Sequence, residues 1–305
     1  MARETTLGDY LRDPSVFPDG PTVCGQVRFI YNDWQMHAGN FWFDQIFFDA
    51  RMEWMQAIGM RKKHDDFMPI VMASHNEFYT PLTYPNEFDV KMGVLSAGRH
   101  EVVLAAAIVI GDEVIASQQV RCAAWDAAEQ KRKRFSDKQL KNLERYILQP
   151  GLPHQVLQYH EAKELATRLV TANKHATPAH VRPSDIGQLG VASTFALGAH
   201  LIEGRQRMLR DAGVLVQGDG RANLVRVNYT AYLRRVRAIG DGYVVVSGID
   251  GIGTTSFSAA SVMCRRRGAD MIPCTVQRLL CVNAVNGTVE PIVGDIRSSL
   301  ESLQI

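Results

Sequence analysis

Two segments of the chain, 33–59 and 187–213, repeat one pattern of apolar and polar positions at a constant offset of 154 residues. In the first segment apolar side chains recur at helical spacing, at Phe43, Phe47, Ala50, Trp54 and Ile58. In the second segment the matching positions hold Leu197, Leu201, Gly204, Met208 and Ala212. Each pattern predicts a long helix that is apolar over most of its circumference, as expected of a helix wrapped by other structure. Gly59 and Gly213 follow where a left-handed cap would fall.

Alternating and apolar runs after each helix predict antiparallel strands joined by tight turns. The strand-like runs FYTPLTY (78–84) and YLRRVRA (232–238) keep the same offset. The runs VVLAAAIVI (102–110) and FSAASVMCR (257–265) come next, and turns at 111–112 and 268–270 separate them from IASQQVRCAAW and IPCTVQRLLCV. A small insertion, GIGTTS, breaks the offset in the second copy. Each copy therefore predicts a strand, a buried helix and then several strands, for which one sheet wrapped around one helix is the economical arrangement.

The fold class predicted from this repeat is α+β, with two tandem units at 1–135 and 176–305 and a helical connector at 136–175. In the connector, Ser136 and Gln139 form a capping box that predicts a short amphipathic helix to about Leu148. A second helical stretch, EAKELATRLV, leads into the second copy. We expect the two units to pair as a pseudo-dimer within the chain, because a lone unit would leave a sheet edge exposed.

Composition narrows the classes of function. The chain has 305 residues, of which 46% are hydrophobic and 22% charged, as in soluble globular proteins. Its net charge of +2 makes no electrostatic case for nucleic acid or membrane partners. No apolar run reaches about 18 residues, and the first residues do not read as a signal peptide. Five widely spaced cysteines without a CxxC favour reduced thiols in the cytoplasm over a disulfide framework or a zinc site. We expect no cofactor and no metal.

One motif in the first copy resembles a known family. It reads Asp33-Trp-Gln-Met-His37-Ala-Gly-Asn40 and is followed by an aromatic helix containing FFDAR. This resembles the hot-dog thioesterases of the 4-hydroxybenzoyl-CoA thioesterase type, whose pattern is an Asp, then Gly-His-Val-Asn-Asn, then an aromatic helix with an acidic-Ala-Arg ending. The resemblance puts Asp33 at the catalytic aspartate, His37 at the His and Asn40 at the second Asn. Met36 and Gly39 depart from the pattern.

The resemblance implies a tandem, or double, hot-dog protein that hydrolyses acyl-CoA or acyl-carrier-protein thioesters. Asp33 would attack the carbonyl carbon or activate a water molecule. Backbone N–H groups at the start of the following helix would hold the charge that develops on the carbonyl oxygen. These N–H groups belong to Asn40, Phe41 and Trp42. His37 would help to place the substrate. Self-association of the chain stays open.

Structural interpretations compete with these roles. An Asp before a helix is usually a cap or turn residue, and His37 and Asn40 could orient the loop instead. Glu53, in the middle of the helix, is the alternative acid. Two further polar residues, His75 and Asn76, lie on a predicted strand that could line the pocket.

The second copy carries a degenerate form of the motif. Gly187 stands where the aspartate would be, Val191 where the His would be and Thr194 where the Asn would be. Asp185 lies two residues too early to take the catalytic role. We therefore expect one working site per chain, on the first helix.

Two alternative functions and two charge runs bear on this interpretation. Hot-dog hydratases and dehydratases resemble a D-x-N-P-x-H pattern, whereas His37 follows Asp33 by four residues and no Asn-Pro stands between them. A non-catalytic acyl-thioester-binding protein is the alternative outside enzymes, since the second copy has lost its motif. The charge runs 131–134 and 265–267 are ordinarily solvated, although each could contact coenzyme A phosphates or an acidic carrier protein.

Overall fold

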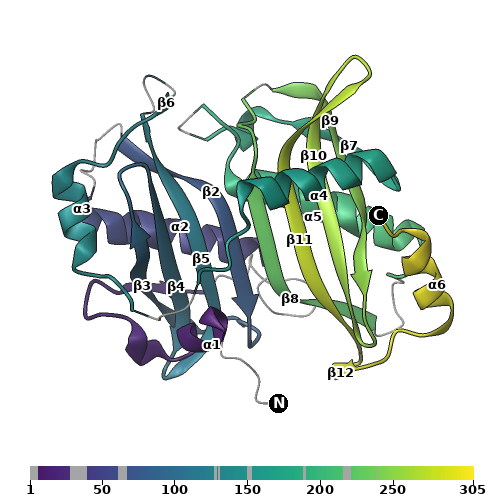
Figure 1. Cartoon of the computed structure of the whole chain (residues 1–305). Coiled ribbons are helices and arrows are strands. Elements are labelled where there is room, and N and C mark those ends of the chain that lie inside the picture. The colour runs from purple at the N-terminus through teal and green to yellow at the C-terminus, as the bar shows by residue number, and fades with distance from the viewer. Residues whose placement is uncertain are drawn as a thin grey trace. The chain divides into compact units, whose positions relative to one another are not determined.

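The protein is described from a computed structural model that covers residues 6–27, 40–60, 67–126, 129, 131–149, 153–187, 190–215, 221–237 and 239–305. The chain forms two compact units, Met1–Val156 and Leu157–Ile305. In each unit one long helix packs against one face of an antiparallel sheet, and the colours run from purple to teal in the first unit and from teal to yellow in the second (Figure 1).

In the first unit the sheet has the strand order β1-β3-β4-β5-β2, and all neighbours are antiparallel. Its strands are β1 (Val23–Gln26), β2 (Phe67–Phe78), β3 (Glu87–Ala97), β4 (Glu101–Ile110) and β5 (Glu113–Asp126). A short strand, β6 (Lys131–Arg132), pairs with β5. The helices are α1 (Leu7–Leu11), α2 (Asn40–Ala57) and α3 (Asp137–Glu144), with a 3₁₀ turn at Pro14–Val16.

The second unit repeats this arrangement, with the strand order β8-β11-β10-β9-β7. Its strands are β7 (His175–Val181), β8 (Arg221–Tyr232), β9 (Gly240–Ile252), β10 (Ser256–Arg267), β11 (Asp270–Val285) and the short β12 (Thr288–Val289). Its helices are α4 (Tyr159–Ala172), α5 (Thr194–Asp211) and α6 (Gly294–Ser302), with a 3₁₀ turn at Pro183–Asp185.

The predicted repeat is confirmed in the structure. Helices α2 and α5 both have 18 residues, and their starts at Asn40 and Thr194 keep the offset of 154. The strands that follow, β2 and β8, both have 12 residues at the same offset. Gly59 and Gly213 adopt φ values of +75° and +71°, the left-handed conformation that the sequence predicts after each helix.

The predicted helix core is also confirmed. Phe47 and Trp54 on α2, and Leu201 and Met208 on α5, are all fully buried. The Trp54 ring packs edge-on against Tyr146, with ring centroids 5.3 Å apart. The apolar periodicity therefore identified the helix faces that the sheets cover.

The strand-like runs after each helix are shorter than predicted. Strand β2 ends at Phe78 and β8 at Tyr232, so most of FYTPLTY and YLRRVRA lies outside the strands. In both units two successive N–H groups donate to one carbonyl of the neighbouring strand: those of residues 79 and 80 to Ile115, and those of residues 233 and 234 to Cys274. Because two donors share one acceptor, the ladder stops there and the chain turns away from the sheet.

The connecting helices and the N-terminal segment complete the units. Ser136 caps α3 with the predicted capping box, but the helix ends at Glu144 rather than near Leu148. Helix α1, which the sequence analysis did not predict, buries Leu7 and Leu11 against β4. No helix among the described residues is long and apolar enough to span a membrane.

Candidate active site

The start of α2 is the place to which the motif points. Asp33 and His37 lie outside the described residues, and so do the side chains of Asn40 and Phe41. Helix α2 begins at Asn40, so the three predicted oxyanion donors fall in its first turn, which ends with the half-buried Trp42. N–H groups in the first turn of an α-helix have no acceptor within the helix, which is what an oxyanion site requires.

A chain of polar side chains begins one turn further along α2, on the face covered by the sheet. Asn76 on β2 donates from Nδ2 to Asp44 Oδ1, at 2.9 Å. Gln118 on β5 donates to Asn76 Oδ1, at 2.9 Å, and Arg51 Nη1 donates to Gln118 Oε1, also at 2.9 Å. Asn76, Gln118 and Arg51 are buried, while Asp44 keeps partial access to solvent. The chain of hydrogen bonds thus ends on the carboxyl group of Asp44.

The environment of Asp44 changes its acidity. Burial raises its pKa to about 6, against the smaller opposing effects of the Asn76 hydrogen bond and the Arg51 charge. A carboxyl group with a pKa near 6 exchanges a proton close to neutral pH, which suits general acid–base chemistry. Asp44 is therefore the described carboxyl group at this end of α2 that is poised to take up and release a proton.

Glu53, the alternative acid, is exposed and lies nine residues after Asp44 on the same helix. At about 100° per residue, nine residues place two side chains on opposite faces of a helix. The structure therefore does not bring Glu53 to the Asp44 chain.

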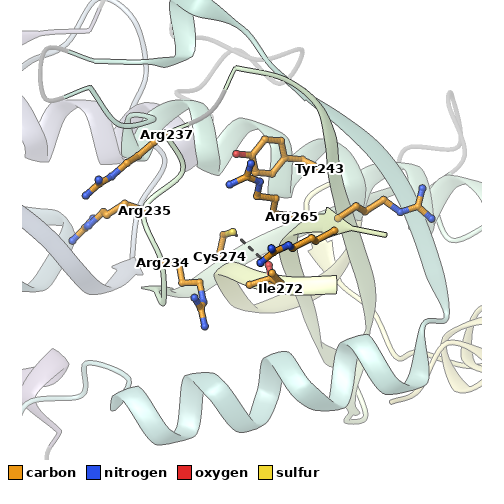
Figure 2. A pocket seen from close by; sticks show the side chains of 9 residues that line it. Arg234, Arg235, Arg237, Tyr243, Arg265, Ile272 and Cys274 are labelled. Atoms are coloured by element: carbon orange, nitrogen blue, oxygen red, sulfur yellow. Dashed lines mark hydrogen bonds between the residues drawn. The ribbon is translucent and has the colours of Figure 1, made fainter. Parts of the chain in front are cut away.

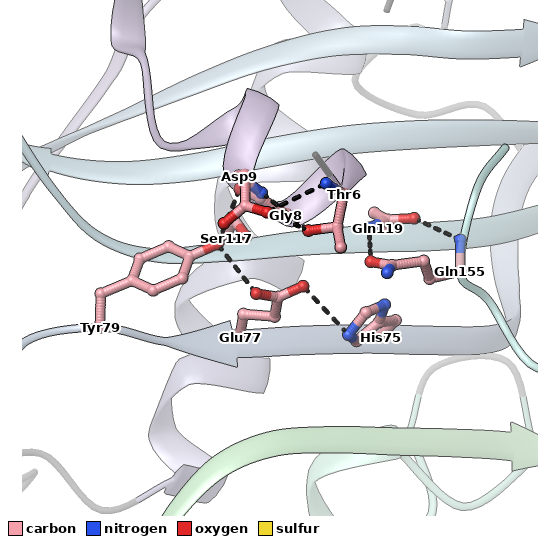
Figure 3. Close-up of polar contacts among 9 residues, drawn as sticks. All are labelled: Thr6, Gly8, Asp9, His75, Glu77, Tyr79, Ser117, Gln119 and Gln155. Carbon is pink, nitrogen blue, oxygen red and sulfur yellow. Dashed lines mark hydrogen bonds and ion pairs between the residues drawn. The ribbon is translucent and has the colours of Figure 1, made fainter. Parts of the chain in front are cut away.

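The two strand residues considered from the sequence point to opposite faces of the sheet. Asn76 faces α2, whereas the buried His75 faces the other side, where its Nε2 lies 3.4 Å from Glu77 Oε1. Figure 3 shows this second cluster beneath α1, where the Tyr79 hydroxyl lies 2.8 Å from Ser117 Oγ and donates to the Gly8 carbonyl. His75 therefore lies on the face of the sheet opposite to the Asp44 chain, beside Glu77.

The second unit keeps part of the same polar chain but lacks its carboxyl group. Arg205 and Gln277 are buried at the places of Arg51 and Gln118, and Gln277 donates to Thr230 Oγ1 at 3.4 Å. Gly198 stands where the first unit has Asp44, and a Cβ atom there would meet nothing within 4 Å. The second unit thus keeps the buried Arg and Gln of the polar chain, whereas the carboxyl group at its end is present at Asp44 and replaced by glycine at 198.

Asp185, which the sequence analysis set aside, has a role in its own loop. Its Oδ2 accepts the backbone N–H of Arg182, at 2.8 Å, and lies 3.2 Å from His200 Nε2 on α5. Both side chains are partly buried. The first contact is that of a turn cap, and the second ties the loop to the helix.

Sequence reasoning missed Asp44 and Gln118. One signal was available for Asp44: it stands seven residues before Arg51, so the two share one helix face within an otherwise aromatic stretch. Gln118 gave no such signal, because its partner Asn76 lies 42 residues away and meets it only through strand pairing.

Comparisons with known proteins agree with this architecture. Residues 32–143 match the sequence model of the thioesterase-like superfamily. The solved structure of the 12:0-ACP thioesterase from Umbellularia californica is similar, with a TM-score of 0.65 and 9% identity, over 86% of this chain and 94% of that one. An acyl-ACP thioesterase from Bacteroides thetaiotaomicron gives a TM-score of 0.60 and 10% identity, over 89% and 99%. A comparison with curated protein sequences gives no match. At these identities the structural likeness shows the fold, and it confirms the predicted hot-dog resemblance.

Proposed function

We propose that this tandem hot-dog protein, whose first unit carries a thioesterase-like domain, hydrolyses acyl-CoA or acyl-carrier-protein thioesters at the start of α2. The observation that carries the proposal is an asymmetry. The superfamily match at 32–143 falls on the unit in which the polar chain ends on an ionisable carboxyl group, Asp44, rather than on Gly198.

Thioester cleavage needs an attacking oxygen and a site for the negative charge on the carbonyl oxygen. In the proposed reaction the Asp33 carboxylate attacks the carbonyl carbon, giving a mixed anhydride that water then hydrolyses, or it takes a proton from an attacking water molecule. The N–H groups in the first turn of α2 stabilise the oxyanion, aided by the helix dipole. The leaving thiolate is stable enough near neutral pH to depart without strong acid assistance.

Asp44 gives the proposal a second carboxyl group at the same end of the helix. Asn76 fixes its orientation, and the pKa of about 6 leaves most of it ionised at neutral pH. In this form Asp44 can accept a proton from the water that attacks the thioester or its anhydride. Asp33 as nucleophile and Asp44 as base are compatible roles, and separate variants distinguish them.

The test is release of free thiol from panels of acyl-CoA and acyl-carrier substrates, measured for wild type, Asp33→Asn, Asp44→Asn and Glu53→Gln. We expect Asp33→Asn to lose at least about 100-fold in kcat, the usual effect of removing a general base. Asp44→Asn should also remove the limb of the pH profile near pH 6. Glu53→Gln, on the opposite face of the helix, is the control and should keep wild-type turnover.

Two results would end the proposal. Wild-type turnover in Asp33→Asn and Asp44→Asn together would show that the start of α2 is not the site. Absence of thiol release from every substrate, with hydration of an unsaturated acyl thioester instead, would indicate the hydratase alternative, and binding without turnover would indicate an acyl-thioester-binding protein.

A further inference from the structure

The face of α5 that packs against its sheet carries a buried arginine with an unpartnered donor. Arg205 is only 7% exposed, and its Nη1 has no hydrogen-bond partner among the described residues. In the first unit the equivalent Arg51 donates from Nη1 to Gln118 Oε1. Gln277 takes the place of Gln118, but its Oε1 is also unpartnered within these residues, so the second unit does not form this bond. A buried charge is costly unless another charged group pairs with it.

The charge of Arg205 is not balanced by an acidic side chain. Within the described ranges Arg205 forms no ion pair, and burial lowers its pKa, with a smaller opposing effect of Cys281. Burial in turn raises the pKa of the Cys281 thiol, so this group is neutral at physiological pH. In the first unit burial raises the pKa of Asp44, and the charge of Arg51 opposes this rise. The first unit thus places its arginine within electrostatic reach of a carboxyl group, two turns earlier on the helix.

Gly198 leaves room at the position that corresponds to Asp44. The residue is buried, and a Cβ atom on it would meet nothing within 4 Å in the part of the chain that the structure describes. Seven residues separate Gly198 from Arg205, as seven separate Asp44 from Arg51, so the two positions share one face of α5. The loss of the carboxyl group therefore leaves space on the same helix face as the unpaired charge.

Thr275 adds a second donor from the sheet. Its side chain is fully buried, and its Oγ1 has no hydrogen-bond partner among the described residues. Thr275 stands two residues before Gln277 on β11, so both side chains point to the face that α5 covers. Cys274, the residue before it, donates its thiol to the Ile272 carbonyl in the wall of an arginine-lined hollow (Figure 2). Strand pairing puts Ala116 at the position of Thr275 in the first unit, so the hydroxyl group occurs in the unit that has lost the carboxyl group.

We infer that the second unit binds a small monocarboxylate between α5 and its sheet, with the carboxylate group beside Gly198, at the position that the Asp44 carboxyl group has in the first unit. Arg205 supplies the opposite charge, and the Thr275 hydroxyl donates a hydrogen bond. A carboxylate accepts several hydrogen bonds and donates none, which matches two buried donors without acceptors. The inference does not depend on the proposed hydrolysis, because it concerns side chains of the second unit alone.

The binding test uses the full chain and three probes. Sodium propionate, neutral propionamide and sodium chloride are each titrated calorimetrically into the wild type. We expect propionate to bind at one molecule per chain. Propionamide has nearly the same shape without the charge, and chloride has the charge without the shape, so neither should bind detectably.

The first variant removes the hydroxyl group at nearly constant shape. Thr275→Val should weaken the affinity for propionate about tenfold, as for the loss of a hydrogen bond to a charged group. Because the hydroxyl that it removes is buried and unpartnered, the variant should keep or raise the wild-type Tm. The matched control is Thr167→Val on the exposed side of α4, which should leave the affinity unchanged.

The second variant restores the carboxyl group within the chain. Gly198→Asp places a carboxylate where the first unit has Asp44, and it should abolish propionate binding. If this variant fails to fold, Thr275→Val still decides the question.

Three results would overturn the site. They are equal propionate affinity in wild type and Thr275→Val, propionate binding that persists in folded Gly198→Asp, and absence of propionate binding by the wild type. Chloride binding as tight as that of propionate would overturn the assignment to a carboxylate. Thiol release, measured on the same samples, tests the hydrolase proposal separately, and its absence would leave this site standing.

Discussion

Asp44 combines a stabilising contact with an unfavourable environment for its charge. Asn76 donates a hydrogen bond to the carboxyl group, yet burial outweighs this bond and raises the pKa to about 6. A carboxyl group whose pKa is raised on folding binds its proton more tightly in the folded state than in the unfolded state. The ionised form therefore lowers the stability of the protein at neutral pH, as is common for functional groups.

Asp44→Asn should stabilise the protein in a pH-dependent way. Between the unfolded pKa of 3.8 and the folded pKa of about 6, the folded wild type holds more protons. Its free energy of unfolding therefore falls as the pH rises through this window, and Asn removes the fall. After allowance for partial solvent access, we expect a gain on the order of 1–2 kcal/mol at pH 7 and almost none at pH 4. Urea denaturation at both pH values measures this, with the exposed Asp49→Asn as control. An equal gain at both pH values would contradict the ionisation argument.

At the scale of the helix, two glycines in α5 allow the effect of side-chain packing on stability to be separated from the effect of helix propensity. A Cβ atom on Gly204 would lie 2.5 Å from Val245 Cγ1, whereas a Cβ atom on Gly198 would meet nothing within 4 Å. The first unit has Ala50 at the position of Gly204, so glycine there follows from the particular strand residue that α5 meets. Glycine at 198 has no such contact to avoid within the described residues.

The two alanine variants should therefore change stability in opposite directions. Gly198→Ala should stabilise the protein by about 0.5–1 kcal/mol, because alanine is the better helix former and has room. Gly204→Ala should destabilise it by about 1–2 kcal/mol net, since overpacking against Val245 exceeds the gain in propensity. Chemical denaturation of the pair gives the answer with each variant as the other's control. Stabilisation by both would mean that β9 yields to the added methyl group.

The buried face of α2 offers a second test at this scale. Phe47→Ala and Trp54→Ala should each lower the free energy of unfolding by about 3–5 kcal/mol, because both side chains are fully buried. Glu53→Ala, next to Trp54 but exposed, should change it by no more than about 0.5 kcal/mol. A small effect of Trp54→Ala in thermal or urea unfolding would mean that the helix face is assigned wrongly.

The elements that could be predicted are those whose sequence pattern is contained within a short stretch of the chain. Helix α2 and its counterpart α5 follow from apolar periodicity, and Gly59 and Gly213 mark their ends. Helix α1 was missed because its five residues are too few for a periodic signal, and burial of Leu7 against β4 stabilises it. In the site, the contact between Gln118 and Asn76 depends on strand register, which no local pattern encodes.

At the scale of the whole molecule, the two units share one fold but carry different sets of polar side chains. The first unit has the motif with Asp33 and the described chain that ends on Asp44, whereas the second has Gly187 and Gly198 at those places. In the second unit six arginines line a hollow, and the matching positions of the first unit hold neutral residues. The two copies thus keep one scaffold and differ in the polar side chains that it carries.

The asymmetry predicts one hydrolytic site per chain. Gly187 has no side chain to attack a thioester or take a proton, and Val191 cannot form a side-chain hydrogen bond. Titration with a non-hydrolysable acyl-thioester analogue should therefore approach one molecule per chain, and Asp33→Asn should lower turnover by about 100-fold or more rather than by half. The decisive comparison is with Asp185→Asn, because Asp185 lies beside the N-cap of α5 and forms an acid–base pair with His200, at 3.2 Å. If Asp185 only caps its turn, its loss lowers the Tm and leaves kcat per folded protein intact. Turnover that survives Asp33→Asn but is lost in Asp185→Asn would make the second unit the active one.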